Sequence, residues 1–226
     1  MEYDWLFIDI DDTLLDFKAC EAMALTATAQ DAQCELTEET YDIYKTINDG
    51  LWAALEAGKI QPKELPLERA CQFEKAVGWF HSPELFNQSY LTHLSQSNAV
   101  LPGALDFLEK ASQLFSLAVA SNGIGDVQRG RLKASGMDKF FQLVVVSEDV
   151  GAAKPSPVFF HQALKMGKIS DPETVLMIGD KRTADVQGAL NCGLCACWFS
   201  PQGGDVDDSR MMIVRDWQEA TKQILF

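Results

Sequence analysis

The chain has 226 residues, of which 47% are hydrophobic and 23% charged, and its formal net charge at pH 7 is −14. This length predicts one or two domains with a sizeable core, and the composition is typical of a globular protein. A chain this acidic is a poor candidate for binding a nucleic-acid polymer, which needs a basic face, but it can bind a small anion where cations gather locally. The start MEYDWLF lacks the basic region of a signal peptide, and the apolar runs are too short to span a bilayer. We therefore expect a cytoplasmic protein with no membrane partner.

A first strand is predicted over residues 3–9, and a long helical stretch follows it. Four helices are expected there, over 19–30, 41–58, 65–78 and 82–94. The second of these has apolar residues at four-residue steps and Gly58 as its expected C-cap, and the fourth begins with Ser82 as N-cap and Pro83 in the first turn. The sequence therefore predicts a helical domain over 16–98, inserted after the first strand and closing over the sheet.

The rest of the chain alternates short apolar runs with helical patterns. Strands are expected over 115–121, 141–147, 174–180 and 195–200, and helices over 103–114, 126–135, 157–167 and 183–193. Strands that alternate with helices indicate a parallel sheet covered on both faces. The expected fold class is α/β, with a doubly wound, Rossmann-like core over 1–15 and 99–226.

Three of the six cysteines, Cys192, Cys195 and Cys197, have a spacing that resembles a metal cluster. A structural zinc site needs four ligands, usually in two separated pairs, and no further cysteine or histidine lies nearby in the sequence. We prefer the alternative that this segment is a buried strand in which cysteine serves as a small apolar residue.

Polar side chains follow the ends of four predicted strands. They are Asp9, Asp11 and Asp12, then Ser121 and Asn122, then Lys154, and finally Asp180 and Asp185. In an open parallel sheet these strand ends share one edge, where ligands bind. Three acids beside a buried strand are costly unless a cation compensates them or they lie in water.

The segments DIDDT, SNG, KP and GDKRTAD resemble the four motifs of the haloacid dehalogenase-like superfamily of phosphohydrolases. They occur in the family's order across the whole predicted core. The inserted helices resemble the helical cap domain of one subgroup of this superfamily. Within that subgroup, INDGLWAALEAGKI and CACWFS are similar to the pyrimidine 5′-nucleotidases.

The resemblance implies a catalytic role for four residues. Asp9 would be the nucleophile and form an aspartyl-phosphate, and Asp11 would protonate the leaving group and later activate water. Ser121 and the neighbouring Asn122 would hold phosphate oxygens, and Lys154 would neutralise the phosphate and position Asp9. Taken alone, the SNG segment is also typical of a turn, and a lysine before proline is typical of a solvated loop.

The resemblance also implies a Mg²⁺ cofactor. Its ligands would be the carboxylates of Asp9 and Asp180 and the backbone carbonyl of Asp11, while Asp185 would act directly or through water. Mg²⁺ prefers oxygen ligands and commonly binds one or two carboxylates together with a phosphate. For Asp180 and Asp185 the alternative is a helix N-terminal cap.

Some residues bear on competing functions. Asp11 favours a phosphatase over a dehalogenase, because a halide leaves without a proton. Asp12 stands where phosphomutases of the family usually have glycine. Lys181 stands where the family often has serine or threonine; with Arg182, it would attract phosphate or point to solvent. A phosphatase or phosphomutase for a sugar phosphate is the alternative, and a catalytically silent phosphate-binding relative is a third hypothesis.

Three residues of the helical insertion, Asn48, Trp52 and Arg69, are candidate substrate contacts. The aromatic ring would stack on a base, and the amide and guanidinium would read polar groups. The alternatives are that Trp52 belongs to the core and that Arg69 pairs with Glu68 or a nearby acid. We expect a monomer or weak homodimer that acts as a Mg²⁺-dependent phosphatase on small phosphomonoesters. The resemblance implies pyrimidine nucleoside monophosphates as the substrates.

Overall fold

The computed structural model describes residues 3–56, 59–61 and 63–226. It divides into two compact units: a core unit, Met1–Phe17 with Asn98–Phe226, and a helical unit, Lys18–Ser97. The limits expected from the sequence differ from these by two residues at one junction and one residue at the other. That the helical unit acts as a cap domain stays a prediction.

Within the described residues, six strands form one sheet in the order β3-β2-β1-β4-β5-β6, and every neighbouring pair is parallel. The strands are β1 (Trp5–Ile8), β2 (Ser116–Ser121), β3 (Leu143–Val146), β4 (Val175–Gly179), β5 (Cys195–Phe199) and β6 (Met211–Val214). The strand order reverses beside β1, which pairs with β2 on one side and β4 on the other. The predicted α/β fold with a doubly wound parallel sheet is therefore confirmed.

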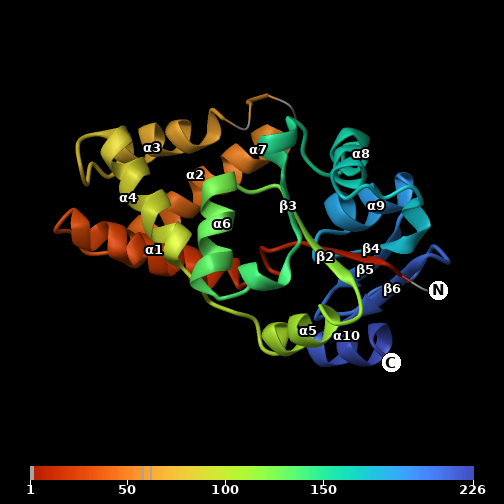
Figure 1. Ribbon diagram of the computed structural model, residues 1–226. Helices are drawn as coiled ribbons and strands as arrows, with labels where there is room; N and C mark the ends of the chain where they lie inside the picture. Colours follow the sequence, from red (N-terminus) through yellow and green to blue (C-terminus); the bar gives the residue numbers. More distant parts are fainter. Residues whose placement is uncertain (1–2, 57–58, 62) are drawn as a thin grey trace. The chain divides into compact units, whose positions relative to one another are not determined.

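Helices cover both faces of this sheet, with α8 and α9 on one face and α5 and α10 on the other (Figure 1). The core-unit helices are α5 (Ala104–Ala111), α6 (Gly125–Ala134), α7 (Ser147–Val150), α8 (Pro157–Met166), α9 (Gly188–Asn191) and α10 (Trp217–Ile224). The rings of Phe107 in α5 and Trp217 in α10 pack with their centroids 4.5 Å apart.

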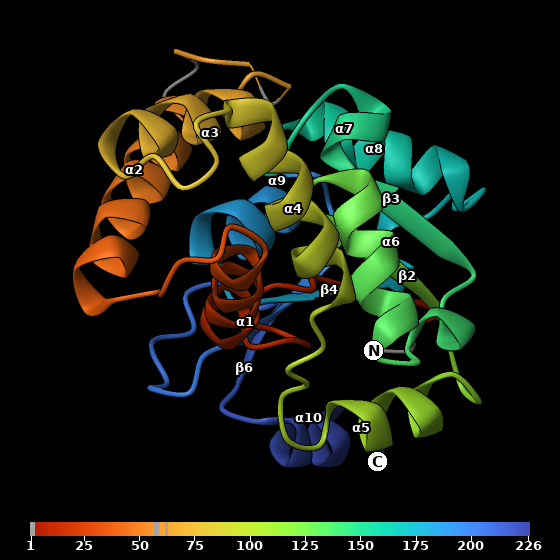
Figure 2. The same cartoon turned by 90° about the vertical axis from the view of Figure 1, so that its left-hand side faces the viewer.

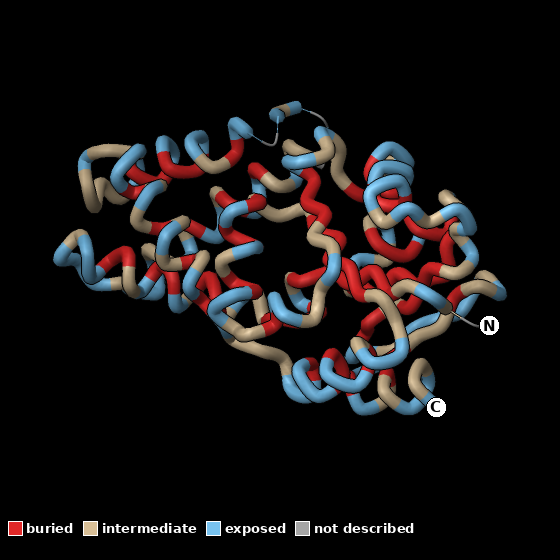
Figure 3. Tube along the Cα trace, viewed as in Figure 1, coloured by how far each residue is buried: buried red, intermediate tan, exposed pale blue. Residues whose placement is uncertain are grey.

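The strands are apolar along almost their whole length because both faces of the sheet are covered. Phe7 lies beside Ala118 and Met177 in the strand register, and all three side chains are fully buried in one cluster. In Figure 3 the middle of the sheet is a continuous buried stretch. Cys195 and Cys197 are buried in β5, so the interpretation of this segment as a strand is confirmed.

Some elements of the core unit differ from the expectation. The short helix α7, the strand β6 and the helix α10 were not predicted from the sequence. The single helix expected over 183–193 is instead a π-helical turn, Arg182–Gln187, that leads into α9. In this turn the Val186 N–H donates to the carbonyl of Lys181, five residues earlier, which is the π-helical pattern.

The described part of the helical unit contains four helices: α1 (Phe17–Asp31), α2 (Glu38–Glu56), α3 (Leu65–Ala76) and α4 (Pro83–Gln96). Figure 2 shows α2, α3 and α4 from another side. Their common core is aromatic: Phe86 stacks on Tyr90 with centroids 5.9 Å apart, and Phe73 stacks on Phe86 at 4.6 Å.

Local signals at the ends of these helices have a mixed outcome. The Ser82 hydroxyl accepts a hydrogen bond from the Leu85 N–H, 3.3 Å away, and Pro83 is the first residue of α4, as predicted. The expected C-cap Gly58 lies outside the described residues. Among the helices that the structure describes, none combines the length and apolar character that crossing a bilayer requires.

Candidate active site

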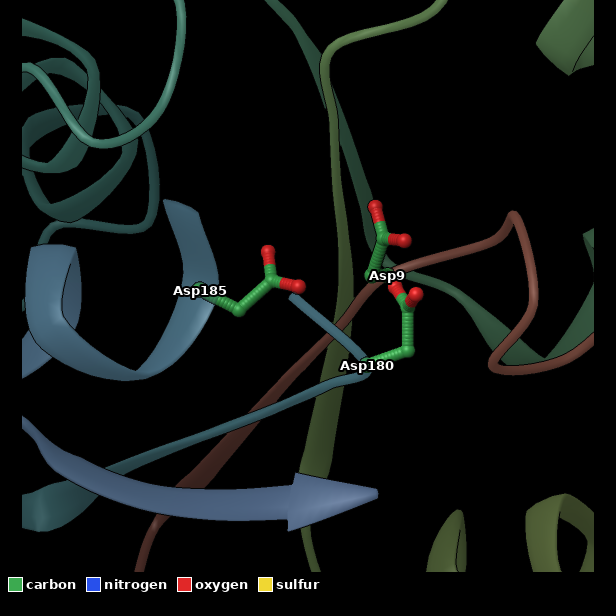
Figure 4. A group of neighbouring side chains, drawn as sticks. All are labelled: Asp9, Asp180 and Asp185. Atoms are coloured by element: carbon green, nitrogen blue, oxygen red, sulfur yellow. The ribbon is translucent and has the colours of Figure 1, made fainter. Parts of the chain in front are cut away.

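Three aspartates converge at the carboxyl ends of β1 and β4. Asp9 follows β1, Asp180 follows β4, and Asp185 belongs to the π-helical turn after it. One carboxylate oxygen of each lies within 4.8 Å of the others, and Figure 4 shows the three side chains pointing toward one another. Because Ile8 and Ile178 are paired in register, the residues that follow them emerge side by side. The structure thus brings together the acids that the sequence placed at two strand ends.

Lys154 occupies the same site and is buried. Its Nζ donates to Asp9 Oδ1 at 2.8 Å, to Asp185 Oδ1 at 2.6 Å and to the Ala120 carbonyl at 2.6 Å. Both ends of the Asn122 amide bind the backbone of Lys154, at 2.8 and 2.9 Å. Asn122 therefore positions the lysine loop, and its expected contact with phosphate stays a prediction.

The site carries more negative than positive charge. Burial raises the pKa of Asp9 well above its ordinary range; Lys154 opposes this effect, and Asp185 adds to it. Burial also raises the pKa of Asp180 to about 6. Burial alone would lower the pKa of Lys154, but Asp185 and Asp9 raise it, so the ammonium stays protonated. An additional cation would relieve this excess of negative charge.

The carboxylates are suited to a hard divalent cation. Asp180 Oδ1 is buried and has no hydrogen-bond partner among the described residues, which is costly unless a ligand binds it. Both oxygens of Asp185 already accept protein donors, Lys154 Nζ and the Lys181 N–H at 2.9 Å. The donor set therefore fits Mg²⁺ held by Asp9 and Asp180, with Asp185 better placed to act through water.

Asp11 is held by two side chains of α6. Its Oδ2 accepts from Gln128 Nε2 at 2.8 Å, and its Oδ1 accepts from Arg131 Nη1. Gln128 Nε2 also donates to the Ser121 hydroxyl at 3.0 Å, so it links two predicted catalytic residues. Sequence reasoning missed Gln128 and Arg131, because nothing in the helical pattern separates them from exposed polar neighbours such as Arg129.

Asp12 and Thr13 shape the turn after β1. Asp12 adopts φ 55°, in the left-handed region, and its Oδ1 accepts from the Phe17 N–H at 3.1 Å. The Thr13 carbonyl accepts from Trp217 Nε1 at 2.8 Å. Short acidic side chains tolerate this backbone conformation better than most residues.

The two cations after Asp180 have different environments. Lys181 Nζ lies 3.5 Å from Asp180 Oδ2 on a largely exposed side chain. Arg182 instead donates to Asp207 Oδ2 at 2.7 Å, and its guanidinium lies 4.9 Å from the centre of the Trp198 ring. Lys181 thus stands beside the acids, whereas Arg182 fastens the loop before β6.

In the helical unit, the structure brings together two of the three candidate substrate contacts. Arg69 Nη1 donates to Asn48 Oδ1 at 3.1 Å, and both side chains are buried. The Arg69 guanidinium lies 4.7 Å from the centre of the Tyr90 ring. Of the acids considered as alternative partners of Arg69, Glu68 accepts from Gln72 and forms no ion pair with Arg69 among the described residues, whereas the charge of the nearby Glu21 acts on Arg69. The Trp52 side chain is half-buried, so the alternative that Trp52 belongs to the core is only partly supported.

Glu21 is a further buried polar residue of the helical unit that sequence reasoning missed. Burial raises its pKa to about 7, although the charge of Arg69 opposes this shift. Glu21 Oε1 and Arg69 Nε and Nη2 are buried without a hydrogen-bond partner among the described residues, and the buried Tyr44 ring lies 5.7 Å from the Arg69 guanidinium. We call Glu21, Tyr44, Asn48 and Arg69 the helical-unit polar cluster.

Comparison with known proteins gives a consistent result. The model of a family described as haloacid dehalogenase-like hydrolase matches residues 6–199. The HAD-hydrolase YfnB of Bacillus subtilis is 37% identical over 199 residues, which cover 88% of this chain and 85% of YfnB. The pyrimidine 5′-nucleotidase PynA of Streptococcus pneumoniae is 35% identical over 202 residues, covering 89% of this chain and 85% of PynA.

A further relative is the pyrimidine 5′-nucleotidase YjjG of Escherichia coli, 30% identical over 200 residues that cover 88% of this chain and 87% of YjjG. Among solved structures, a crystal structure of Bacillus subtilis YfnB bound to magnesium matches with a TM-score of 0.88 and 34% identity. That match covers 100% of both chains.

Proposed function

The chain belongs to the haloacid dehalogenase-like hydrolase family and is a phosphomonoester hydrolase, and from this premise we propose that it is a Mg²⁺-dependent phosphatase acting on pyrimidine nucleoside 5′-monophosphates. The observation that carries the proposal is the cluster of Asp9, Asp180, Asp185 and Lys154 at one edge of the sheet. The pyrimidine substrate is supported by two relatives that are named for it.

In this proposal Asp9 attacks the phosphorus atom. Lys154 bonds one oxygen of Asp9 and leaves the other available for attack. The ammonium also brings a buried positive charge to the place where phosphoryl oxygens gain negative charge. A carboxylate is suited to this role because the resulting acyl phosphate is readily hydrolysed.

Asp11 and Ser121 supply the remaining proton transfer and phosphate contact. Asp11 gives a proton to the leaving alkoxide and later takes one from the attacking water. The Ser121 oxygen accepts from the Gly123 N–H at 3.1 Å and from Gln128 at 3.0 Å. Because both bonds use the oxygen as acceptor, the hydroxyl proton is free to donate to a phosphate oxygen.

Asp9 and Asp180 would hold Mg²⁺, with Asp185 acting through water and the Asp11 carbonyl as a further ligand. Bound there, Mg²⁺ would neutralise charge on the phosphoryl oxygens. The support is the unpartnered Asp180 Oδ1 together with the excess of buried acids, and the magnesium in the crystal structure of the relative YfnB.

The helical-unit polar cluster would select the base. A pyrimidine such as uracil offers two carbonyl acceptors and one N–H donor. Arg69 has two buried nitrogens without partners, and Glu21 has a buried oxygen without a partner, so the two residues offer complementary groups. Trp52, half-buried in α2, would provide a stacking surface.

A panel of phosphomonoesters tests the proposal. UMP, dUMP and dTMP, the matching purine nucleotides, ribose 5-phosphate and p-nitrophenyl phosphate are assayed for phosphate release, each with Mg²⁺ and with EDTA. We expect the highest kcat/KM for the pyrimidine nucleotides and no turnover with EDTA. A preference for the sugar phosphate would contradict the substrate, and full activity in EDTA would contradict the metal.

The role of the helical unit has a separate test. Arg69→Met removes two unpartnered donors, so we expect kcat/KM for UMP to fall about 10-fold to 200-fold while that for p-nitrophenyl phosphate is unchanged. Lys45→Met is the matched control, because Lys45 is an exposed cation of the same unit. Equal losses on both substrates would show that Arg69 serves the fold and not base selection.

A further inference from the structure

The carboxylate of Asp11 is occupied on both oxygens by side chains from one face of α6. Gln128 and Arg131 are three residues apart and therefore adjacent on the helix. Gln128 Nε2 bonds Asp11 Oδ2 at 2.8 Å, Arg131 Nη1 bonds Asp11 Oδ1, and Arg131 Nη1 also bonds Gln128 Oε1 at 3.0 Å. These contacts fix the plane of the carboxylate, since two donors from one rigid element reach its two oxygens.

The backbone after β2 leaves room for this arrangement. A Cβ atom on Gly123 would lie 2.3 Å from Gln128 Nε2 and 2.8 Å from Gln128 Cδ, closer than real Cβ contacts. Gly123 is therefore the position over which the Gln128 side chain crosses to reach Asp11 and Ser121. The SNG segment therefore forms its own turn and also leaves space for the Gln128 side chain of α6.

A comparison within α6 separates Arg131 from an ordinary surface arginine. Arg129, two residues earlier, is 45% exposed in its side chain and pairs with Asp149 at 2.9 Å. The Arg131 side chain is only 1% exposed, although a buried guanidinium is costly and an apolar residue would pack the same space. The buried cation is directed at Asp11, a residue of the proposed chemistry, and at Gln128.

We propose that Gln128 and Arg131 are positioning residues for Asp11. They hold its carboxylate where it meets the leaving-group oxygen, and Gln128 couples this orientation to the Ser121 hydroxyl. The inference rests on the proposed function. As the bond from phosphorus to the ester oxygen breaks and a bond to Asp9 forms, the electron pair goes to the ester oxygen, which takes a proton from Asp11.

The nature of the leaving group tests this role. UMP releases an alkoxide that needs a proton, whereas p-nitrophenyl phosphate releases a stabilised phenolate that does not. For Arg131→Met and Gln128→Met we expect kcat for UMP to fall about 10-fold to 100-fold with little change in KM, because a misoriented acid slows only the proton transfer. The first-turnover burst of nitrophenolate should be retained. Arg131→Lys, which keeps the cation, should recover part of the lost activity.

The matched control is Arg129→Met, which removes an exposed arginine from the same helix and should leave both substrates unaffected. Combining Arg131→Met with Asp11→Asn should cause no further loss beyond Asp11→Asn alone, because both changes remove one function.

Three results would overturn the inference. Equal losses of UMP turnover and nitrophenolate burst, with a lowered Tm, would mean that Arg131 and Gln128 serve only the fold. If Asp11→Asn discriminates between the leaving groups but neither α6 variant does, the positioning role fails while the proposed function stands. If Asp11→Asn itself does not discriminate, the assignment of Asp11 fails and the inference fails with it.

Discussion

The two units of the protein each bury a polar cluster, and the clusters differ in how their buried cation is satisfied and in which atoms stay without a partner among the described residues. In the core unit, Lys154 Nζ has three acceptors within 2.8 Å. In the helical unit, Arg69 has one hydrogen-bonded partner, Asn48, and two nitrogens without one among the described residues. Unpartnered buried polar atoms are costly, and the core site leaves an acceptor, Asp180 Oδ1, whereas the helical-unit polar cluster leaves donors of Arg69, which is why we propose different ligand groups for the two.

The two clusters also differ in the groups that they would offer to a substrate. The core site presents fixed charges suited to any phosphoryl group, because Lys154 and the aspartates bind one another regardless of the rest of the ligand. The helical-unit polar cluster presents donors and an acceptor suited to a particular arrangement of polar atoms. The general chemistry and the substrate choice would therefore be separable by mutation.

The largest effect is expected for Asp9→Asn, which removes the nucleophile and keeps its shape. We expect turnover of UMP and of p-nitrophenyl phosphate to fall alike, on the order of 10⁴-fold or more, since both need the covalent step. The fold should be retained, because burial raises the pKa of the Asp9 carboxyl, so a neutral amide costs less to bury, and it also removes the repulsion from Asp185. Phosphate release and calorimetric Tm measure the two effects.

Asp4→Asn is the matched control, because Asp4 is exposed just before the same strand. Turnover near the wild-type level in Asp9→Asn would refute the assigned nucleophile. A loss of activity confined to UMP would also contradict the proposed division of roles between the two units. Asp9, a residue of the core unit, would then influence the choice of substrate.

The core site was predictable because its residues are short-range features of the sequence. Asp9 and Asp180 end two predicted strands, and a parallel sheet brings neighbouring strand ends together. Lys154 lies in a loop, but it entered the prediction through a motif shared with a family. The fold class followed from the alternation of strands and helices alone.

The residues that were missed depend on tertiary packing. Gln128 and Arg131 look like the polar face of an amphipathic helix, and only the structure shows that this face is buried. Glu21 lies in a helix whose composition gave no sign of a buried acid. The π-helical turn that positions Asp185 was read as regular helix, because its sequence contains no signal for the extra residue. Such positions are set by neighbours that are distant in the sequence.

A smaller effect tests how rigid the core site is. A Cβ on Gly179, the last residue of β4, would lie 2.3 Å from Asp185 Cγ, and this short side chain has little freedom to move. Gly179→Ala should therefore displace Asp185 from Lys154 and from the Lys181 N–H. We expect the Mg²⁺ concentration for half-maximal activity to rise about 10-fold to 100-fold, as for other residues that orient metal ligands. A titration of activity against Mg²⁺ measures this.

Gly50→Ala provides the control, because a Cβ at Gly50 in α2 meets no atom within 4 Å. It should leave the Mg²⁺ requirement unchanged and stabilise the helix by about 1 kcal/mol. An unchanged Mg²⁺ requirement in Gly179→Ala would mean that the core site adapts, and would contradict its description as a set of fixed charges.

The smallest effect is expected for Glu21→Gln and concerns how the free energy of unfolding depends on pH. Burial raises the pKa of Glu21 from 4.5 to about 7, so between these values the folded protein binds more protons than the unfolded chain. Its stabilising contribution is fully present below about pH 4.5 and is lost as pH rises through about 7. Glu21→Gln stays neutral, so its free energy of unfolding should exceed that of wild type by up to ~3 kcal/mol at pH 8 and much less at pH 5.

Urea unfolding of both proteins at the two pH values measures this difference, and subtracting wild type removes the titration of all other groups. Glu35→Gln, at an exposed position of the same unit, is the matched control. A difference between Glu21→Gln and wild type that stays constant with pH would mean that Glu21 is ionised in the folded protein and already neutralised by Arg69. The charge of Arg69 would then be balanced within the helical-unit polar cluster, and the reason to assign this cluster a substrate would disappear.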